Sequence, residues 1–472
     1  MFCCQGNAAT AQGEIFMSYS NDDVRRMVRS EEVKRINAHS YDKSRRASNR
    51  DTWLLNNMKL DLDHVLTEEQ IQTVNDFWKP YEFAYKNNWK LQAMYTKISG
   101  RFDPSYSGFG MQRFLMMNYW NDSSFMTIRK KAFSTLFFSK TVKSPRMLLM
   151  NISGEYLDEN RNRISYHRAV DVLYDRLKET RHGEAIMKPS DGGEGTGIRF
   201  INSGMRKDEL KKILQAYNTN FVCEEVIKNH TSISVFYDGA LNTMRMCTFL
   251  WNDEIRFAGA VLRIGVSGRV DNWSKGGLAC GINPDGSLQH YAFTEKGEIV
   301  TEHPTTGVAF EGHRIYRYEE AVALVKRLHG MIPQQKYVSW DITVDEDGEL
   351  VLVELNSPGS YELVEMAGYN GYFDKETAKE VFDKYLITNF YYDRANFDWD
   401  YREFNDHISL RKYCGSDKEV VIPREIDGTP VRLVYAGAIN DEKIEKIVVP
   451  ETVVVNGRAI VKAAPNCVVV KI

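Results

Sequence analysis

The clearest pattern along the chain is an alternation of apolar and polar residues on both sides of Asp347-Gly348. Asp-Gly is typical of a two-residue hairpin turn, and counting outward from it pairs Glu346 with Glu349 and Asp341 with Glu354. Strand period two then predicts one apolar face and one polar face. The apolar face holds Trp340, Ile342, Val344, Val351, Val353 and Leu355, and the polar face holds Ser339, Asp341, Thr343, Leu352, Glu354 and Asn356.

The polar face of this predicted hairpin places two carboxylates opposite each other. Carboxylates directly across a sheet repel, and a divalent cation between them would relieve that repulsion. Asn356 adds a third oxygen on the same face. Asp341, Glu354 and Asn356 therefore indicate a hard-cation site suited to Mg²⁺ and to the phosphates of a substrate. The alternative is a half-buried hairpin whose polar face is simply solvated.

A glycine-rich loop follows a short apolar run that ends in Lys188-Pro189. Glycines let backbone amides approach an anion closely, and a lysine can place a point charge on a phosphate. The glycines of this loop are Gly192, Gly193, Gly195 and Gly197. No Gly-Lys-Ser/Thr follows, so this is not the Walker pattern, and an ordinary hairpin loop is equally compatible with it.

Two arginines further along the chain are candidate anion clamps. Residues 221–227 and 241–249 are strand-like, and the second run contains Asn242 and Arg245. Arg263 follows in the next apolar stretch. A guanidinium group forks onto paired oxygens, so Arg245 and Arg263 suit a phosphate or a carboxylate. Each arginine, taken singly, is also compatible with an ordinary surface position.

The order of these segments resembles the ATP-grasp superfamily, and most closely the ATP-grasp proteins associated with sugar transfer and cell-surface polysaccharide genes. The resemblance covers about residues 100 to 390. It implies an α+β fold in which two α+β subdomains clasp ATP. The segments that carry it are Lys188-Pro189 with its glycine loop, Glu-Glu-Val-Ile at 224–227, Asn-Thr-x-Arg at 242–245, and Asp341 with Glu354-x-Asn356.

The resemblance also implies roles for residues on the nucleotide side. Asp341, Glu354 and Asn356 match the magnesium-binding positions. Lys188 matches the lysine at the nucleotide phosphates, and the loop from Gly192 to Gly197 matches the one that closes over them. The hinge whose backbone reads the adenine edge matches Glu224, Glu225, Val226 and Ile227, with Glu225 and Val226 as the expected contacts. A second nucleotide lysine is expected at Lys131, and Lys130 is nearly as good a match.

On the acceptor side, the resemblance places Asn242 and Arg245 against the transferring phosphate or an acceptor carboxylate. Asp271-Asn272, ahead of Gly276-Gly277, resembles an acceptor-side loop. Peptide ligases of the superfamily often carry an arginine two residues before the metal aspartate. That position is Ser339 here, which indicates different acceptor chemistry.

Together these assignments predict an ATP- and Mg²⁺-dependent, ADP-forming ligase that joins a small carboxylate to an amine, in cell-surface polysaccharide or related metabolism. Lys188, Arg245, Asn242 and Arg263 are its expected catalytic residues. One alternative is a phosphotransferase acting on a hydroxyl, with His290, His303 or His313 as the base. Another is a degenerate ATP-grasp scaffold used only for binding, although an intact Asp…Glu-x-Asn set argues against it.

Composition bounds these hypotheses. The 472 residues are 43% hydrophobic and 26% charged, which suits two or three domains with a sizeable core. A net charge of −3 gives no nucleic-acid footprint, and no stretch is long enough to span a membrane. Seven scattered cysteines without a CxxC pair predict reduced thiols and a cytoplasmic protein.

The chain is predicted to contain four segments. Residues 1–20 are small and polar and predict a disordered tail, and residues 21–100 predict a helical region with a capping box at Thr67–Gln70 and a break at Pro80. Residues 101–395 form the ATP-grasp-like part. In residues 405–472, Val-Val-Ile-Pro recurs as Ile-Val-Val-Pro after 27 residues, which predicts a short solenoid resembling BspA-type leucine-rich repeats and a possible homodimer contact.

Overall fold

The computed structural model describes residues 8–11, 14–17, 41–58, 60–81, 87–108, 121, 123–191, 196–357, 359, 361–368, 375–382, 399–404, 406–415, 417–426 and 429–472. The chain divides into two compact units. One unit is Arg46–Val381, and the other combines Met1–Arg45 with Phe382–Ile472. Each unit is described separately below.

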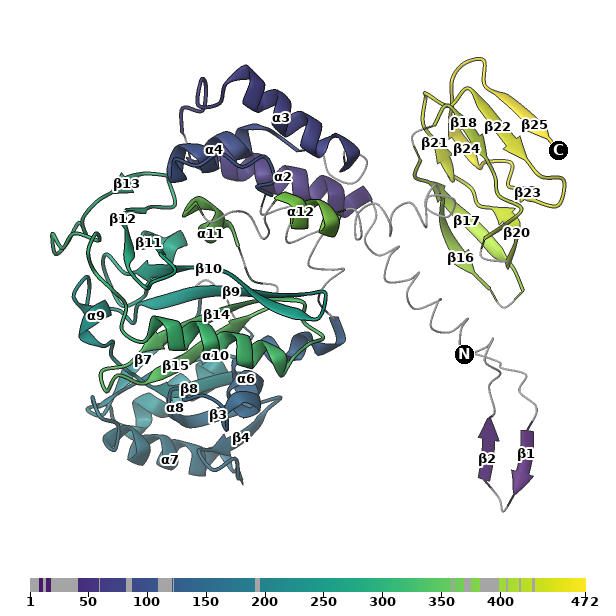
Figure 1. The fold of residues 1–472 in the computed structure, drawn as a ribbon. Helices are drawn as coiled ribbons and strands as arrows, with labels where there is room; N and C mark the ends of the chain where they lie inside the picture. Colours follow the sequence, from purple (N-terminus) through teal and green to yellow (C-terminus); the bar gives the residue numbers. More distant parts are fainter. Residues whose placement is uncertain are drawn as a thin grey trace. The chain divides into compact units, whose positions relative to one another are not determined.

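Two antiparallel sheets form the larger unit (Figure 1). The six-stranded sheet has the order β5-β4-β3-β8-β6-β7, with β3 Met147–Ile152, β4 Glu155–Asp158, β5 Arg163–Ile164, β6 Glu184–Pro189, β7 Arg199–Asn202 and β8 Phe221–Glu225. The seven-stranded sheet has the order β13-β12-β11-β10-β9-β14-β15, with β9 Thr243–Trp251, β10 Glu254–Ile264, β11 Leu278–Ile282, β12 Leu288–Phe293, β13 Ile299–Val300, β14 Tyr337–Val344 and β15 Leu350–Asn356. Helices lie outside the sheets, so the predicted α+β class is confirmed.

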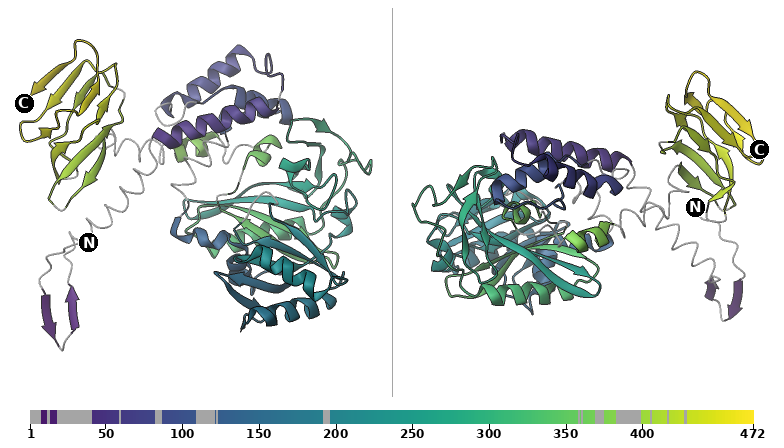
Figure 2. Two further views of the ribbon diagram at one scale, coloured as in Figure 1. Left: turned by 180° about the vertical axis from the view of Figure 1, so that it is seen from behind. Right: turned by 45° about the horizontal axis from the view of Figure 1, so that its top comes forward.

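Amphipathic helices cover one face of each sheet (Figures 1 and 2). Helices α7 (Tyr166–Lys178) and α8 (Lys207–Tyr217) bury leucines at helical spacing against Ala185 and Met187 of β6. Helix α10 (Tyr318–Gly330) does the same on the seven-stranded sheet, where its core cluster includes Trp340.

Helix α6 (Lys131–Phe138) connects the two sheets. Its Ala132 is in a cluster with Met150 and Val222 of the six-stranded sheet. At its C-terminal end, the ring of Phe138 meets that of Trp340 edge to face at 5.7 Å. The first turn of α6 is therefore held between β8 and β15, where the predicted charged residues lie.

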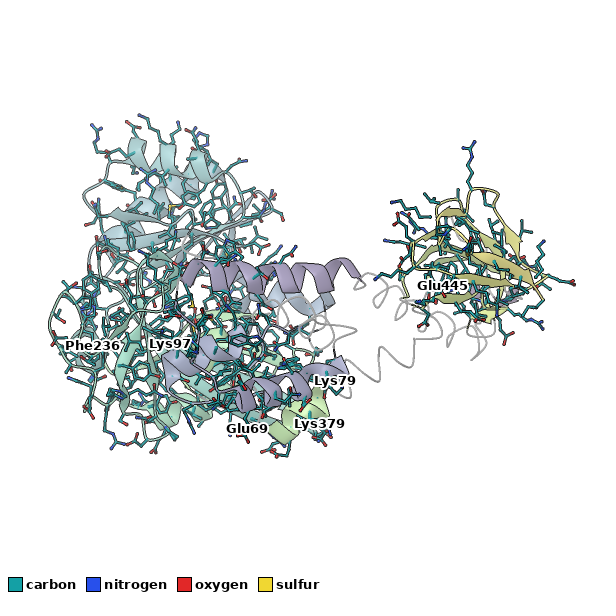
Figure 3. The ribbon with its side chains drawn as sticks, turned by 90° about the horizontal axis from the view of Figure 1, so that it is seen from above. Glu69, Lys79, Lys97, Phe236, Lys379 and Glu445 are labelled. Carbon is teal, nitrogen blue, oxygen red and sulfur yellow. The ribbon has the colours of Figure 1, made fainter. Side chains whose placement is uncertain are left out.

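The N-terminal part of the larger unit is helical, with α2 (Tyr41–Met58), α3 (Glu68–Trp78) and α4 (Lys90–Ser99); Figure 3 views it from above with Glu69, Lys79 and Lys97 labelled. The predicted capping box is confirmed, because Thr67 and Gln70 exchange side chain to backbone hydrogen bonds. Pro80 falls in a short 3-10 turn directly after α3. Two more helices, α11 (Glu362–Met366) and α12 (Lys375–Phe382), follow β15. Among the described helices, none is long and apolar enough to cross a bilayer.

The β14–β15 hairpin pairs Asp341 with Glu354 as predicted, but its turn differs from the prediction. The turn is not a two-residue Asp347-Gly348 turn: Asp345 N donates to Glu349 O at 2.9 Å, and Gly348 N donates to Asp345 O at 2.8 Å. These bonds enclose a three-residue loop in which Gly348 has φ +81°. Val344 therefore pairs with Leu350, one residue away from the predicted register.

A β-bulge then restores the predicted pairing. The register shifts between Asp341 and Ile342, so that Val353 is the extra residue. Between the bulge and the turn the predicted faces are exchanged: Leu352 pairs with Ile342 and joins the core, whereas Val351 pairs with Thr343. The predicted positions of Leu352 and Val351 are therefore wrong, and the predicted opposition of the carboxylates is confirmed.

The C-terminal part of the second unit is a short solenoid. Strands β18 (Glu419–Val421), β22 (Lys446–Val449) and β25 (Val468–Lys471) stack in parallel, and Glu419 pairs with Lys446 at the predicted offset of 27 residues. Parallel pairs also join β17 (Ile408–Tyr413), β20 (Thr429–Val434) and β23 (Val454–Val455), and β21 (Ile439–Asn440) with β24 (Ile460–Lys462). The first strand, β16 (Trp399–Glu403), pairs antiparallel with β17, and β19 (Glu425–Ile426) pairs with β20. The BspA resemblance of this solenoid stays a prediction.

Within residues 1–20, for which composition predicts disorder, β1 (Ala8–Ala11) and β2 (Glu14–Met17) pair as an antiparallel hairpin.

Candidate active site

The polar centre of the seven-stranded sheet is a buried cluster of two arginines around Asp341. Strand register sets Arg245 of β9 directly beside Asp341 of β14. Arg245 Nε donates to Asp341 Oδ1 at 2.6 Å, and Arg245 Nη2 donates to Oδ2 at 3.3 Å. Arg263 of β10 donates through Nη2 to the same Oδ2 at 3.0 Å. Because Asp341 is only 2% exposed, these are low-dielectric, charge-assisted contacts.

The electrostatics of this cluster favour an ionised Asp341. Burial alone would raise the pKa of Asp341, but the guanidinium groups of Arg245 and Arg263 outweigh it and lower the pKa below its ordinary value. Burial would likewise lower the pKa of Arg245, yet Asp341 raises it. The cluster is therefore a fixed set of charges at neutral pH, not a proton-transfer pair.

Asp271 extends the cluster from the segment between β10 and β11. Thr243 Oγ1 donates to Asp271 Oδ2 at 2.5 Å, and Arg263 Nη2 lies 3.5 Å from the same oxygen. Burial raises the pKa of Asp271, and Arg263 only partly offsets it. The predicted acceptor-side residue Asp271 thus lies beside Arg263, whereas Thr243 is a contact that sequence reasoning missed, although it lies inside the Asn-Thr-x-Arg run.

Two lysines face this cluster from the side of the six-stranded sheet. Lys131 Nζ, at the start of α6, lies 2.9 Å from Glu354 Oε1. Lys188 Nζ, on β6, lies 2.5 Å from Glu224 Oε2 of β8, off that oxygen's hydrogen-bonding direction. Burial would lower the pKa of Lys188, but the carboxylate of Glu224, aided by that of Glu354, raises it. Of the two lysines that the sequence left open, Lys131 is the one in contact with a predicted metal ligand.

The predicted metal ligands fit Mg²⁺ in part. Mg²⁺ takes one or two protein carboxylates together with waters and substrate phosphates. In the described structure no contact engages Glu354 Oε2 or Asn356 Oδ1, so both oxygens suit that role. Asp341 differs, because its Oδ2 already accepts from Arg245 Nη2, Arg263 Nη2 and Asn356 Nδ2 (3.3 Å). Its Oδ1 accepts from Arg245 Nε alone within the described part of the chain, so that oxygen keeps a lone pair for a cation. Among described residues, no group of three or more His, Cys, Asp or Glu side chains could hold a metal.

Two backbone amides of the predicted adenine hinge are engaged within the protein. The amide of Glu225 donates to Arg146 O at 2.8 Å, and the amide of Val226 donates to Glu184 O at 3.2 Å. Sheet bonds thus remove both amides as donors to a base. The Glu225 side chain is also engaged, since its Oε1 accepts from Arg181 N at 2.6 Å. Ile227 follows at the first position beyond these bonds, and no backbone hydrogen bond of its amide is present among the described residues.

The structure does not bring Asn242 to the charged cluster. Its side chain is fully buried, with Nδ2 donating to Tyr237 O at 2.6 Å and Oδ1 accepting from Gly265 N at 2.9 Å. Asn242 therefore supports the backbone around β9, and its role opposite a transferring phosphate stays a prediction.

The remaining predicted positions are the glycines of the loop and the three histidines considered as alternative bases. Gly192, Gly193 and Gly195 lie outside the described residues, and Gly197 is described, exposed and at φ +73°. Among the alternative bases, His303 is fully buried, with Nε2 against Gly265 O at 2.9 Å. His290 and His313 are exposed and half-buried respectively.

Comparison with known proteins identifies the family. The sequence profile of the sugar-transfer associated ATP-grasp family matches residues 111–381, more than half of the chain, and the chain therefore belongs to this family. Its fold is the α+β ATP-grasp fold, and ATP and Mg²⁺ are its cofactors. No curated protein matches the chain.

Among solved structures, D-alanyl-alanine synthetase A from Vibrio cholerae is similar at 12% identity over 55% of this chain and 65% of that one, with a TM-score of 0.34. The ATP-grasp ligase PsnB with a minimal precursor is similar at 14% identity over 57% and 63%, with a TM-score of 0.32. An L-amino acid ligase from Bacillus licheniformis is similar at 11% identity over 49% and 40%, with a TM-score of 0.27. The chain spans less than two thirds of the length of each of these proteins.

Proposed function

We propose that the protein is an ATP- and Mg²⁺-dependent ligase that joins a carboxylate to an amine and releases ADP and phosphate. The observation that carries this proposal is the contact of Lys131 with Glu354 beside the arginine pair of Asp341. The carboxylate of Glu354 also helps to raise the pKa of Lys188, the second lysine of this region. Lysines and a metal-suited carboxylate fit a polyphosphate, and forked guanidinium groups fit a carboxylate or a transferring phosphoryl group.

In the proposed reaction, a carboxylate oxygen of the acceptor attacks the γ-phosphorus, and the bond to the β–γ bridging oxygen breaks to release ADP. The amine then attacks the acyl carbon and phosphate leaves, with loss of one amine proton. Glu354 and Asn356 would hold Mg²⁺, which supplies charge neutralisation at the phosphates when bound. In this proposal Lys188, Lys131 and Arg245 offset the charge that spreads over the transferring group.

The arginine pair supports an anionic acceptor. Arg245 and Arg263 share Asp341, so two positive groups face one buried negative charge, and Asp271 adds a second carboxylate whose pKa burial raises. Any pair of acceptor oxygens that reaches Arg263 would meet donors already fixed in place, which lowers the ordering cost of binding. Serine at position 339, where peptide ligases often carry arginine, suits an acceptor other than a peptide.

The biological setting belongs to the same proposal. We place the reaction in cell-surface polysaccharide or related metabolism, supported by the family's association with sugar transfer. The solenoid of the second unit carries exposed apolar residues, Val454, Val461, Val468 and Val469 among them, which support a contact with a second copy of the chain. Light scattering of the full chain tests that contact, and a monomer at all concentrations would contradict it.

Hydroxylamine trapping tests the ligase reaction without knowledge of the amine. Purified protein is incubated with Mg-ATP, hydroxylamine and a pool of carboxylic acids and sugars, and ADP, hydroxamates and phosphorylated alcohols are measured by mass spectrometry. We expect equal amounts of ADP and one hydroxamate, and neither with the Glu354→Gln variant. A phosphorylated alcohol instead of a hydroxamate would support the phosphotransferase alternative, and full activity of Glu354→Gln would contradict the metal assignment.

A further inference from the structure

An arginine in a segment that joins two strands of the seven-stranded sheet contacts the six-stranded sheet. Arg269, in the segment between β10 and β11, contacts Glu184 at the start of β6 through two parallel bonds, Nη1 to Oε1 at 2.9 Å and Nη2 to Oε2 at 2.7 Å. Its guanidinium carbon also lies 3.8 Å from the ring centroid of Phe200 on β7. Two groups of the six-stranded sheet thus meet at one guanidinium, which the segment between β10 and β11 carries.

The segment that carries Arg269 is anchored at its base. Tyr237 OH donates to Gly268 O at 2.8 Å, Thr305 Oγ1 donates to Val266 O at 2.8 Å, and His303 Nε2 lies 2.9 Å from Gly265 O. Beyond Arg269, the side chain of Asp271 is held in the arginine cluster. The segment therefore presents Arg269 from a fixed base, which reduces the entropy cost of its bidentate contact.

Glu184 lies on the nucleotide side of β6, at the opposite end from Lys188. Side chains two and four residues apart share a strand face, so Glu184 and Lys188 point the same way, while Ala185 and Met187 point into the helical core. Four residues of strand separate the two by about 13 Å. Glu184 O also accepts the Val226 amide, beside the hinge. Lys188 thus marks the phosphate end of the site, and Glu184 marks the base end.

We propose that Arg269 and Glu184 form a clasp that holds the two sheets together at the base end of the nucleotide and sets the rate at which nucleotide leaves. The proposal rests on the nucleotide site of the proposed function. Both side chains are partly exposed, at 42% and 32%, so the pair adds little to folding stability and can open and close. The hinge side is joined separately, by Arg181 with Asp347 and His182 with Glu346.

Variants that break the Arg269–Glu184 pair should release a fluorescent nucleotide faster than wild type. Stopped-flow displacement of mant-ADP with Mg²⁺ is measured for wild type, Arg269→Ala, Glu184→Gln and the double variant. Each single variant should release nucleotide faster by up to about 5-fold, the upper end of what such an exposed pair supports. The double variant should release it no faster than the singles, and the exchanged pair Glu184→Arg with Arg269→Glu should return the rate toward wild type.

Arg163→Ala is the matched control, because Arg163 makes an exposed ion pair with Glu155 within the six-stranded sheet alone. We expect its release rate to equal that of wild type. Release rates of Arg269→Ala and Glu184→Gln that equal the control, or additive effects in the double variant, would overturn the clasp. Wild-type protein that binds no mant-ADP would overturn the nucleotide site and the clasp together, whereas normal binding with unchanged release would overturn the clasp alone.

Discussion

Replacing Glu224 with Gln removes the counter-charge of a buried lysine. Lys188 is 8% exposed and Glu224 is 2% exposed, so the pair is shielded from water. Removing one partner of a buried ion pair costs about 3–5 kcal/mol, because the other charge stays behind in a low dielectric. We expect the Glu224→Gln variant to lose that amount from its free energy of unfolding in urea.

The pH dependence of this loss has a defined sign. In wild type the Glu224 carboxylate raises the pKa of Lys188. The pair therefore contributes its full stabilisation below the pKa of an unfolded lysine, about 10.4, and this stabilisation is lost only as pH rises through the folded pKa. In Glu224→Gln the carboxylate that outweighs burial is gone, and burial then lowers the pKa of Lys188. The variant should therefore gain stability relative to wild type between pH 7 and 10, as Lys188 loses its proton.

The response of the melting temperature to Mg-ATP is a second test of the Lys188–Glu224 pair. Phosphate oxygens would supply the charge that Glu224→Gln lacks, so Mg-ATP should raise the melting temperature of the variant more than that of wild type. The double variant Glu224→Leu with Lys188→Met should recover most of the lost stability but not the response to nucleotide. Two results would contradict this explanation of the pair. One is a Glu224→Gln variant as stable as wild type at pH 7, and the other is a double variant less stable than Glu224→Gln.

Two other predictions concern His329 and Lys131. Burial lowers the pKa of His329 to about 4. Between pH 6.5 and 4 the unfolded chain therefore binds a proton that the folded chain does not, and the free energy of unfolding should fall by up to about 3 kcal/mol across this range. In urea unfolding, the free energy of unfolding of His329→Gln should not fall in this pH range. Equal pH dependence in the variant and wild type would contradict the role of His329. Lys131 occupies Glu354 Oε1, so Mg²⁺ alone should stabilise Lys131→Ala more than wild type in thermal melts. Identical responses to Mg²⁺ would show that the lysine does not compete with the metal.

The hairpin shows how far local pattern predicts geometry. Asp341 does lie opposite Glu354, but through two local features that cancel, a three-residue turn and a bulge at Val353. Each shifts the register by one residue, and period two cannot detect a pair of compensating shifts. The alternation therefore predicted the pairing of Asp341 with Glu354 correctly and the positions of Val351 and Leu352 incorrectly.

The contacts between the sheets could not be predicted from pattern. Lys131 and Glu354 are 223 residues apart, and Arg269 and Glu184 are 85 residues apart. Strand periodicity says which face a side chain occupies but not which distant face it meets. The hydrogen bonds of the Glu225 and Val226 amides have the same character, because they go to neighbouring backbone that no local signal reveals.

Mg²⁺-dependent nucleotide binding at Glu354 is the central feature of the proposed site. Calorimetric titration of a non-hydrolysable ATP analogue, with and without Mg²⁺, compares wild type with Glu354→Gln and with Glu349→Gln, an exposed carboxylate of the same hairpin. We predict Mg²⁺-dependent binding in wild type and Glu349→Gln, and loss of the Mg²⁺-dependent part in Glu354→Gln. Binding that ignores Mg²⁺ in wild type, or that is unchanged in Glu354→Gln, would contradict the proposed site.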